Sequence, residues 1–590
     1  MEMVPATTAG IAFTERAFED DLVEWVDGLA ADLASGNATG HTLELPRLRV
    51  GERPRRDLAG WQRRLASLLR DVRREFGDSD WDIEWADDGE TCWLVQVRPI
   101  TAATFRNETF TIANHKEILP DPPSVFMTSV IAEGSPQLFD YYRMFDPELT
   151  RQRDFIEVFD GRPLINLSLM TDFMRSLGLP PKLVTDSIGG TDASGEGLRP
   201  LRMFVRWWAL LGLAWAQVTA GPFTRKRLAQ IRALTEAPST SFGEAVDRLR
   251  EVYVLTVHGM TALNTAASAP TALLRAAGTL AEHSSRAETA ATRMFRDLGE
   301  VATTIDGAFD PDRPPLDDAA FAEAWHDWLD RYGHRGIFES DIGRPRYSED
   351  PAPILHSITR AVRLDGRPEP WTARGVLTLP IWLIAKPAIA AREQFRSDAM
   401  RGFRALRADL RRLASADGAD PDALWLLDAD EVRSLDDGWR PDAELLDRRR
   451  MEQEERRRSP IPDVVRRFDP PVLVERSNSF AGVGLVKGTV EGAAWVLSEP
   501  ATRLPDGFDP DHTVLVAASV EAGWLPTFGL VSGVGVEIGG DLSHGSIILR
   551  EVGLPAVTNL TGVHASVRTG ELVRLDAGRG RLDVLERITP

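Results

Sequence analysis

The chain has 590 residues, and its 69 lysines and arginines against 89 aspartates and glutamates give a net charge of −20. This length corresponds to about four domains of ~150 residues, or to three large ones. The acidic balance argues against a general nucleic-acid binder, because no basic excess is available to displace counterions from phosphates. The single cysteine, Cys92, excludes an intrachain disulfide and a cysteine-based zinc cluster, and it suits a reducing cytosol.

Residues 1 to about 105 have the pattern of a mixed α/β domain. Residues 82–85 and 93–98 alternate apolar and polar side chains in part and are predicted to be two strands, joined by a turn at 87–90. Residues 58–76 have apolar side chains at helical spacing, which predicts one helix. The N-terminal residues 1–14 lack the basic and apolar regions of a secretory signal, so we expect a cytoplasmic protein.

Residues 106–465 are predicted to be mainly helical, with clear helices at 242–255, 319–332 and 388–413. The last of these is rich in arginine, and such a run predicts either a solvated face or a helix that faces phosphate. Residues 448–458 (RRRMEQEERRR), followed by two prolines, are typical of a linker between domains.

Two apolar stretches approach the length of a membrane span. Residues 207–223 carry no formal charge, and residues 375–385 are similar but shorter. Polar residues and a proline interrupt the first stretch, so we expect a buried helix and no membrane association. Its tryptophans 207, 208 and 215 are typical of either a core helix or the wall of an apolar pocket.

Residues 470–590 are richer in glycine and valine, with short β-like segments at 490–496, 513–517 and 572–575, and they predict a compact α/β domain. Residues 538–557 (IGGDLSHGSIILREVGLPAV) contain a glycine turn, a short helix and a stop. Ser543 is placed to cap the helix, and Gly553 to end it. His544 then lies at the helix N-terminus, where free N–H groups stabilise an anion such as a phosphoryl group.

This segment resembles the phosphohistidine domain of the PEP-utilising (dikinase) superfamily, whose signature it matches at nearly every fixed position. Residues 488–496 and 522–528 are similar to further segments of that domain. The resemblance implies a swivelling β/α domain in which His544 is phosphorylated. It makes Ser543 and Arg550 supporting residues, although Arg550 is also placed to pair with Glu551 on the surface.

The N-terminal region resembles the second half of the ATP-grasp nucleotide domain of the same superfamily, through residues 3–14, 82–85 and 96–99. The resemblance implies that Glu84 and Gln96 serve Mg²⁺ and nucleotide, that Arg98 serves phosphates, and that Thr14 belongs to the nucleotide site. Carboxylate and amide oxygens are ligands suited to Mg²⁺, and arginine binds phosphate oxygens in a fork.

The first half of that nucleotide domain has no counterpart in this sequence. We therefore expect ATP to bind at a site completed by a separate subunit, as in the phenylphosphate synthases of this superfamily, or the ATPase function to be lost. A PEP/pyruvate barrel is also without counterpart, which makes pyruvate an unexpected acceptor. The expected architecture is thus a partial ATP-grasp domain (1–105), a helical acceptor-substrate domain (106–465) and a swivelling phosphohistidine domain (470–590).

In the central domain, residues 332–341 (YGHRGIFESD) and 344–351 (RPRYSEDP) resemble a segment of rifampicin-phosphotransferase-like proteins, as do residues 107–123. His334 or Glu339 is a candidate general base for an acceptor hydroxyl, and the alternative is a structural salt-bridge network. The expected activity passes the β-phosphoryl group of ATP through His544 to a small organic acceptor, expected to be apolar or aromatic, and gives AMP and inorganic phosphate. The alternatives are a non-catalytic binding protein and a phosphocarrier charged by another phosphoprotein.

Overall fold

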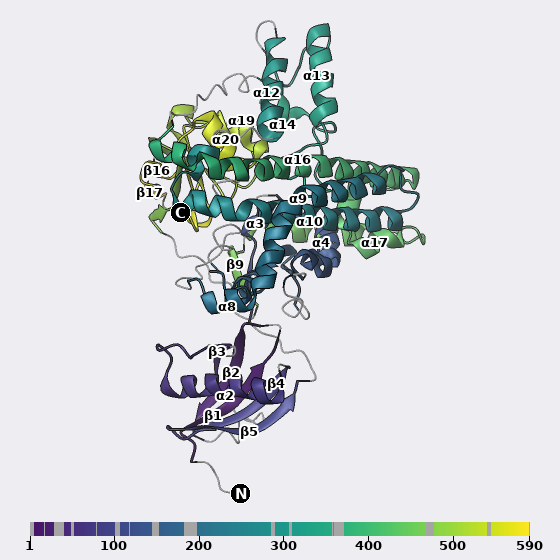
Figure 1. Ribbon diagram of the computed structural model, residues 1–590. Coiled ribbons are helices and arrows are strands. Elements are labelled where there is room, and N and C mark those ends of the chain that lie inside the picture. The colour runs from purple at the N-terminus through teal and green to yellow at the C-terminus, as the bar shows by residue number, and fades with distance from the viewer. Residues whose placement is uncertain are drawn as a thin grey trace.

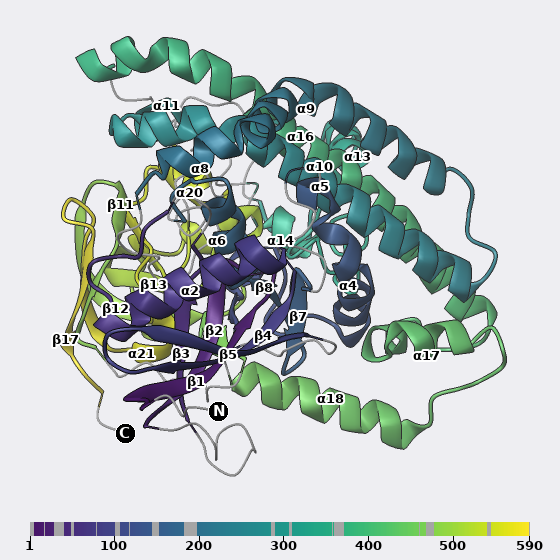
Figure 2. The ribbon, with the colours of Figure 1, turned by 60° about the horizontal axis from the view of Figure 1, so that its bottom comes forward.

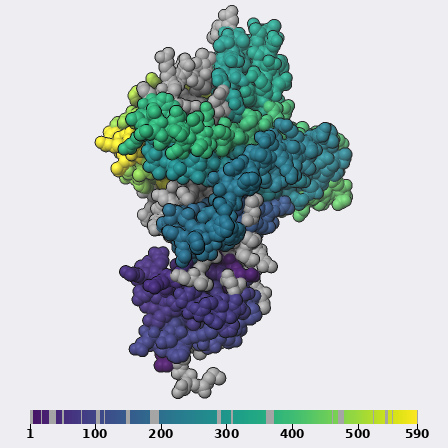
Figure 3. All heavy atoms as spheres, viewed as in Figure 1, coloured from purple at the N-terminus to yellow at the C-terminus, as the bar shows by residue number. Residues whose placement is uncertain are grey.

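The computed structural model describes the chain apart from residues 1–4, 17, 29–39, 49–51, 78, 101–106, 117, 144, 146–152, 182–196, 285–289, 306–308, 357, 359–370, 460, 468–476, 540–543 and 589–590. Three parts follow one another: an N-terminal unit (residues 8–99), a helical body (109–466) and a C-terminal unit (479–586). Figure 1 shows the N-terminal and C-terminal units on different sides of the helical body, and Figure 3 shows the N-terminal unit as a separate lobe. The expected mixed α/β class with a large helical region is confirmed.

The N-terminal unit is an antiparallel sheet with one helix. The strand order is β3-β2-β1-β4-β5. The elements are β1 (Thr8–Thr14), β2 (Asp20–Asp27), β3 (His41–Pro46), α2 (Gly60–Phe76), β4 (Trp81–Asp87) and β5 (Cys92–Pro99). The two expected strands are confirmed as β4 and β5, which pair as a hairpin, and the expected helix is confirmed as α2.

Helix α2 covers one face of this sheet. Its residues Leu65, Leu69 and Val72 recur every three or four positions, so they form a single apolar stripe, which packs against Ala12 and Ile83. Successive side chains of a strand point to opposite faces. The residues next to Ala12 and Ile83 in sequence therefore lie on the face that α2 does not cover.

The helical body consists of long helices and one small sheet. Its helices are α3 (Ala113–Lys116), α4 (Val125–Leu138), α5 (Asp140–Arg143), α6 (Leu167–Ser176), α8 (Pro200–Val205), α9 (Trp207–Leu234), α10 (Phe242–Ala276), α11 (Leu280–Ser284), α12 (Ala290–Thr303), α13 (Ala319–Tyr332), α14 (Ala352–Leu355), α16 (Ala373–Ala416), α17 (Ala429–Ser434) and α18 (Ala443–Arg458). Helices α10 and α16 pack along each other and share a core with α4 and α9. Figure 2 shows these long helices crossing the top of the body.

The small sheet has the order β7-β8-β6-β9, from β6 (Thr109–Thr111), β7 (Ile156–Phe159), β8 (Arg162–Asn166) and β9 (Val464–Arg466). Strand β6 follows the N-terminal unit, and its partner β9 precedes the C-terminal unit. The chain therefore enters and leaves the helical body at the same place, and both flanking units are connected there.

The C-terminal unit is built on a mixed sheet of order β10-β17-β16-β12-β13-β14-β15-β11. Its strands are β10 (Ser479–Ala481), β11 (Val483–Val486), β12 (Thr489–Leu497), β13 (Thr513–Ala517), β14 (Gly533–Val536), β15 (Ala556–Thr558), β16 (Leu572–Asp576) and β17 (Arg581–Glu586), and its α-helices are α19 (Leu525–Phe528), α20 (His544–Val552) and α21 (Val563–Ser566). The strands expected at 490–496, 513–517 and 572–575 are confirmed as β12, β13 and β16.

Two sequence predictions are wrong. Residues 448–458 are the end of α18 and not a linker, because ion pairs four residues apart, such as Arg448–Glu452 and Arg458–Glu454, support an exposed helix. The helix at 207–223 is not buried: Trp215 is 69% exposed, and Trp207 and Trp208 are also exposed.

The arginine-rich part of α16 is only partly a solvated face. Arg396 and Arg407 are buried and pair with Glu339 and Glu349. Among the described residues, α16 is the one helix that is long and apolar enough to cross a bilayer by length and composition, with 22% of its apolar window buried. One such helix is weak grounds for a membrane span, because core helices pass the same test.

Candidate functional site

Helix α20 begins at His544, as the sequence predicts, and ends at Val552. Gly553 has a φ of 71° and donates its N–H to Leu549, so it ends the helix in the left-handed conformation expected of a glycine there. The His544 side chain and the capping residue Ser543 lie outside the described residues. Arg550 lies in the last turn of the helix and is half-buried.

The start of α20 is fixed by close packing. A β-carbon at Gly545 would lie 2.3 Å from the backbone oxygen of Val520, so only glycine fits there. Ile548 and Leu549 are buried and belong to a hydrophobic cluster beneath the helix. Near the beginning of the signature segment, Gly539 donates its N–H to the side chain of Asn559. The start of α20 is therefore packed against the segment after β13, and Gly539 is tied to the segment after β15.

Glu84, Gln96 and Arg98 come together on the face of the N-terminal sheet that α2 leaves uncovered. Glu84 on β4 lies opposite Gln96 on β5. Arg98 donates to Glu84 over 3.0 Å and pairs with Asp82 over 3.2 Å. The β-strand register shifts directly after Glu84, a bulge of the kind that redirects side chains near functional sites.

The same face has oxygen donors that fit Mg²⁺. Asp82, Glu84 and Gln96 supply carboxylate and amide oxygens, and Asp82 Oδ1 is buried without a hydrogen-bond partner among the described residues. Such hard oxygens suit Mg²⁺, which binds few protein ligands and keeps several waters. Asp82 is an addition to the residues that the sequence singled out.

Thr14 is not brought to this cluster. It is fully buried, and its hydroxyl accepts a 2.8 Å hydrogen bond from Arg73 of α2. Arg73 also pairs with Asp21 over 2.9 Å. Thr14 therefore lies on the covered face of the sheet, while Glu84 lies on the other, and its place in a nucleotide site remains a prediction that the geometry does not support.

His334 and Glu339 are both buried in the segment that follows α13. His334 contacts the hydroxyl of Ser397 over 3.1 Å, and its Nδ1 has no partner among the described residues. Burial, followed by the charges of Arg401 and Arg335, lowers the pKa of His334 to about 3, so the ring is neutral.

Glu339 is 1% exposed and is surrounded by arginines. Arg335 donates to it over 2.5 Å, and Arg396 lies 3.3 Å away. Burial raises the pKa of Glu339, but these arginines outweigh burial and hold the pKa at about 2. A general-base role does not fit a carboxylate that is closed off and held ionised by two ion pairs, so the geometry supports the structural alternative for Glu339.

Trp208 and Trp215 of α9 line a hollow of about 350 Å³. Its walls are mostly apolar and come from α5, α9, α10 and the segment after α5, with Tyr141, Phe145, Trp208, Trp215, Phe223 and Ala262 among the lining residues. The aromatic segment thus forms the wall of a pocket, which is the alternative that the sequence left open. Such pockets suit apolar or aromatic small molecules.

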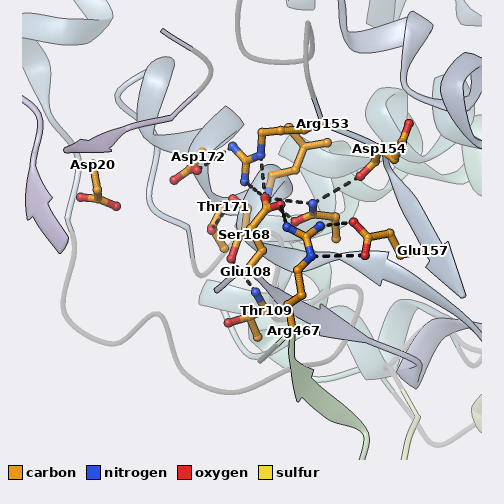
Figure 4. A network of polar contacts seen from close by, with 12 residues as sticks. Asp20, Glu108, Thr109, Arg153, Asp154, Glu157, Ser168, Thr171, Asp172 and Arg467 are labelled. Carbon is orange, nitrogen blue, oxygen red and sulfur yellow. Dashed lines mark hydrogen bonds and ion pairs between the residues drawn. The ribbon is translucent and has the colours of Figure 1, made fainter. Parts of the chain in front are cut away.

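A polar cavity of about 70 Å³ lies between the N-terminal unit and the helical body. Buried Arg153 is one of its lining residues, and it pairs with Glu108 over 2.6 Å and with Asp172 over 2.9 Å, as Figure 4 shows. Asp20 of β2 faces this network, and burial together with Asp172 raises its pKa to about 7. The sequence carried no signal for this cluster, because its members are isolated charged residues on separate elements.

Two family models match the chain. Residues 251–377 match the fourth domain of rifampicin phosphotransferase, and residues 509–580 match the mobile domain of PEP-utilising enzymes. The second match contains α20 and His544. The architecture and these matches describe a multidomain protein with a C-terminal mobile domain.

Three relatives show how far the similarity extends. The Streptomyces sviceus protein named rifampicin phosphotransferase is 24% identical over 88% of this chain and 68% of its own length. An uncharacterised Mycobacterium tuberculosis protein is 29% identical over 46% of this chain, and the prodigiosin synthesizing transferase PigC of Serratia marcescens is 25% identical over 43%. These last two alignments each span only 32% of the relative's length. These matches support a relationship to the PEP-utilising (dikinase) superfamily.

Proposed function

We propose that the chain is a dikinase-type phosphotransferase, in which His544 carries a phosphoryl group from ATP to an organic acceptor. The observation that carries this proposal is the position of His544 as the first residue of α20, inside the segment that matches the mobile domain. The free N–H groups of the first turn favour a dianionic phosphoryl group beside them. Gly545 lets this turn lie directly against Val520, in the segment after β13.

In the first transfer, the imidazole of His544 attacks the β-phosphorus of ATP, and the bond from that phosphorus to the oxygen of the α-phosphate breaks, which releases AMP. Water then removes the γ-phosphate as inorganic phosphate. In the second transfer, the acceptor hydroxyl attacks the phosphorus on His544, loses its proton and restores the imidazole. ATP, water and the acceptor thus give AMP, inorganic phosphate and the phosphorylated acceptor. Because a covalent intermediate on His544 divides the phosphoryl transfer into two displacements, the reaction with ATP and the reaction with the acceptor can take place in separate sites.

The uncovered face of the N-terminal sheet is the proposed nucleotide site. Arg98 is half-exposed and placed to exchange its contact with Glu84 for a phosphate group. Asp82, Glu84 and Gln96 would hold Mg²⁺, which neutralises phosphate charge during transfer. We propose that a separate subunit covers this face and supplies the other phosphate-binding residues.

The acceptor is proposed to be apolar or aromatic, because the hollow beside α9 is lined mostly by aromatic and small side chains. This class agrees with the printed names of the relatives, two of which refer to rifampicin and prodigiosin. Replacing Trp215 with alanine is expected to raise the KM for such an acceptor, while phosphorylation of His544 stays unchanged.

Labelling with β-³²P-ATP tests the proposal. The chain is incubated with labelled ATP and Mg²⁺, alone and with the products of neighbouring genes, and the label is examined for loss in acid. Acid-labile label in the wild type that is absent from His544→Ala supports the proposal. His512→Ala is the matched control, since His512 is an exposed histidine of the same unit and should leave the label unchanged.

The outcomes also separate the alternatives. Label that appears only when a second protein is present supports the proposal that a separate subunit completes the nucleotide site. Label that appears only with another phosphoprotein as donor would make the chain a phosphocarrier. Equal, background label in wild type and His544→Ala with every donor would make it a non-catalytic binding protein.

A further inference from the structure

The C-terminal unit lies against the helical body through a shared hydrophobic core. From the helical body, one buried cluster contains Trp328 of α13, Tyr347 before α14, and Ile354 of α14. The same cluster contains Trp524 and Phe528 of the C-terminal unit. In Figure 1 α19 and α20 lie beside α12 and α14, on the side of the body away from the N-terminal sheet. A mobile unit that visits that sheet has to leave this interface first.

Gly523 lies very close to the helical body at the interface. A β-carbon at this position would lie 2.6 Å from Cγ1 of Ile337, which is closer than real carbon atoms come. The glycine therefore lets the segment before α19 lie flat on the helical body. Any larger side chain at 523 would push the two surfaces apart.

Glu521 makes a buried polar contact two residues earlier. Its carboxylate accepts a 2.6 Å hydrogen bond from the backbone N–H of Phe338, and the side chain is only 5% exposed. Phe338 has a φ of 52°, a left-handed conformation that is uncommon for a phenylalanine. That conformation is retained where it directs the N–H at the carboxylate of the other unit.

The charged groups that face Glu521 come from two elements of the helical body. Arg335 and Glu339 lie on the segment after α13, and Arg396 lies on α16. The phenol of Tyr347 is also close enough to interact with the carboxylate. The two arginines attract the carboxylate, but both are already paired with Glu339.

A second buried carboxyl lies on the same interface. Glu537 follows β14, is 9% exposed and accepts a 2.7 Å hydrogen bond from the N–H of His564. From the helical body it faces the carboxyl of Asp463, with which it shares a hydrogen bond, and the ammonium of Lys116. That ammonium is already held 2.5 Å from Asp463, and the Lys116 carbonyl accepts a hydrogen bond from Ser519.

We propose that Glu521 and Glu537 form a proton-operated latch, which holds the C-terminal unit on the helical body when both carboxyl groups are protonated and releases it when they ionise. The inference rests on the proposed function, because it concerns the departure of this unit toward the nucleotide site. Both carboxyl groups belong to the mobile unit, and both meet groups of the helical body that are already paired.

The direction of the pH effect follows from burial. Burial raises the pKa of Glu521 from 4.5 to about 7 against the attraction of Arg396, and burial together with Asp463 raises the pKa of Glu537. When the unit departs, water reaches both carboxyl groups, and the pKa values of Glu521 and Glu537 fall toward their ordinary values. The docked state therefore binds more protons than the released state, so the contribution of Glu521 to docking is complete below pH 4.5 and is lost as the pH rises through about 7. Glu521 alone lowers the docked-to-released ratio about tenfold between pH 6 and pH 8.5.

Amide hydrogen exchange of the full chain, read by mass spectrometry, tests the latch. Peptides covering residues 333–343 and 522–530 report the two sides of the interface, and a peptide from α10 reports the core of the body. After correction for the intrinsic pH dependence of exchange, protection of both interface peptides is expected to fall about tenfold or more from pH 6 to pH 8.5. Protection of the α10 peptide is expected to stay constant.

The variants separate a latch from a simple contact. Glu521→Gln keeps an acceptor for the Phe338 N–H without a charge, so combined with Glu537→Gln it should keep the interface protected at every pH. Glu521→Ala and Gly523→Val should lower protection at every pH. Glu499→Gln is the matched control, because Glu499 reaches Arg344 across the same interface but is 46% exposed, and it should retain the wild-type response.

Constant protection in the wild type, or an unchanged pH response in the double glutamine variant, would overturn the latch. These measurements need no ATP, partner or acceptor. Failure of the latch therefore leaves the labelling of His544 untouched, and absence of that label leaves the exchange result intact.

Discussion

Replacement of Glu339 by glutamine gives a sharp test of the buried charge cluster. The carboxylate is 1% exposed and balances Arg335 and Arg396, with Arg346 donating to its backbone oxygen over 2.7 Å. Its pKa falls from an ordinary 4.5 to about 2 in the folded chain. That difference corresponds to about 3 kcal/mol of folding free energy at neutral pH.

Because folding lowers this pKa, the contribution is present above pH 4.5 and is lost as pH falls through 2. Glu339→Gln is therefore expected to lower the free energy of unfolding at pH 7 by about 3 kcal/mol, since it leaves Arg335 and Arg396 without a balancing charge. Urea denaturation followed by circular dichroism reports the helical body, and the midpoint should fall by about 1 M. The difference between variant and wild type should shrink as the pH is lowered below 4.5.

Two further results complete this test. Glu349→Gln is the matched control, because Glu349 pairs with Arg407 but is 32% exposed, and it should change the stability by less than about 1 kcal/mol. If Glu339→Gln unfolds at the wild-type urea concentration and instead abolishes transfer from phosphorylated His544 to an acceptor, then Glu339 acts in catalysis and the structural assignment is refuted.

Two more predictions follow from close packing. Gly545→Val should abolish labelling of His544, because the new side chain meets the Val520 oxygen and displaces the start of α20; labelling at the wild-type level would show that this start is not fixed. Cysteines replacing Ile337 and Gly523 in a Cys92→Ser background should form a disulfide, since the β-carbons would lie 3.4 Å apart, near the short end of the disulfide range. Oxidation should then block labelling of His544 and reduction should restore it, whereas equal labelling in both states would show that the unit need not leave the body.

The sequence predicted those elements whose signals are local. The hairpin of β4 and β5 follows from alternation and a turn, and α20 follows from a glycine stop and apolar spacing. Glu84 and Gln96 face each other because strand pairing translates sequence directly into neighbours. Their roles toward nucleotide stay predictions.

The predictions that failed depended on contacts distant in sequence. The tryptophans of α9 have the composition of a core helix, but exposure is decided by which neighbours cover them. The arginine pattern of α16 gave no sign that Arg396 is buried, because its partner Glu339 lies 57 positions away. Glu521 and Glu537 carried no signal at all, since their environment arises only where two units meet.

The central claim is that His544 carries a phosphoryl group, and mass spectrometry tests it most directly. The chain is incubated with ATP, Mg²⁺ and the proposed partner, digested under alkaline conditions that preserve phosphohistidine, and sequenced in the spectrometer. The account predicts one phosphoryl group on the peptide that contains His544, and its loss when acceptor is added. A peptide that stays unmodified under every donor, while phosphorylated acceptor accumulates, would contradict it.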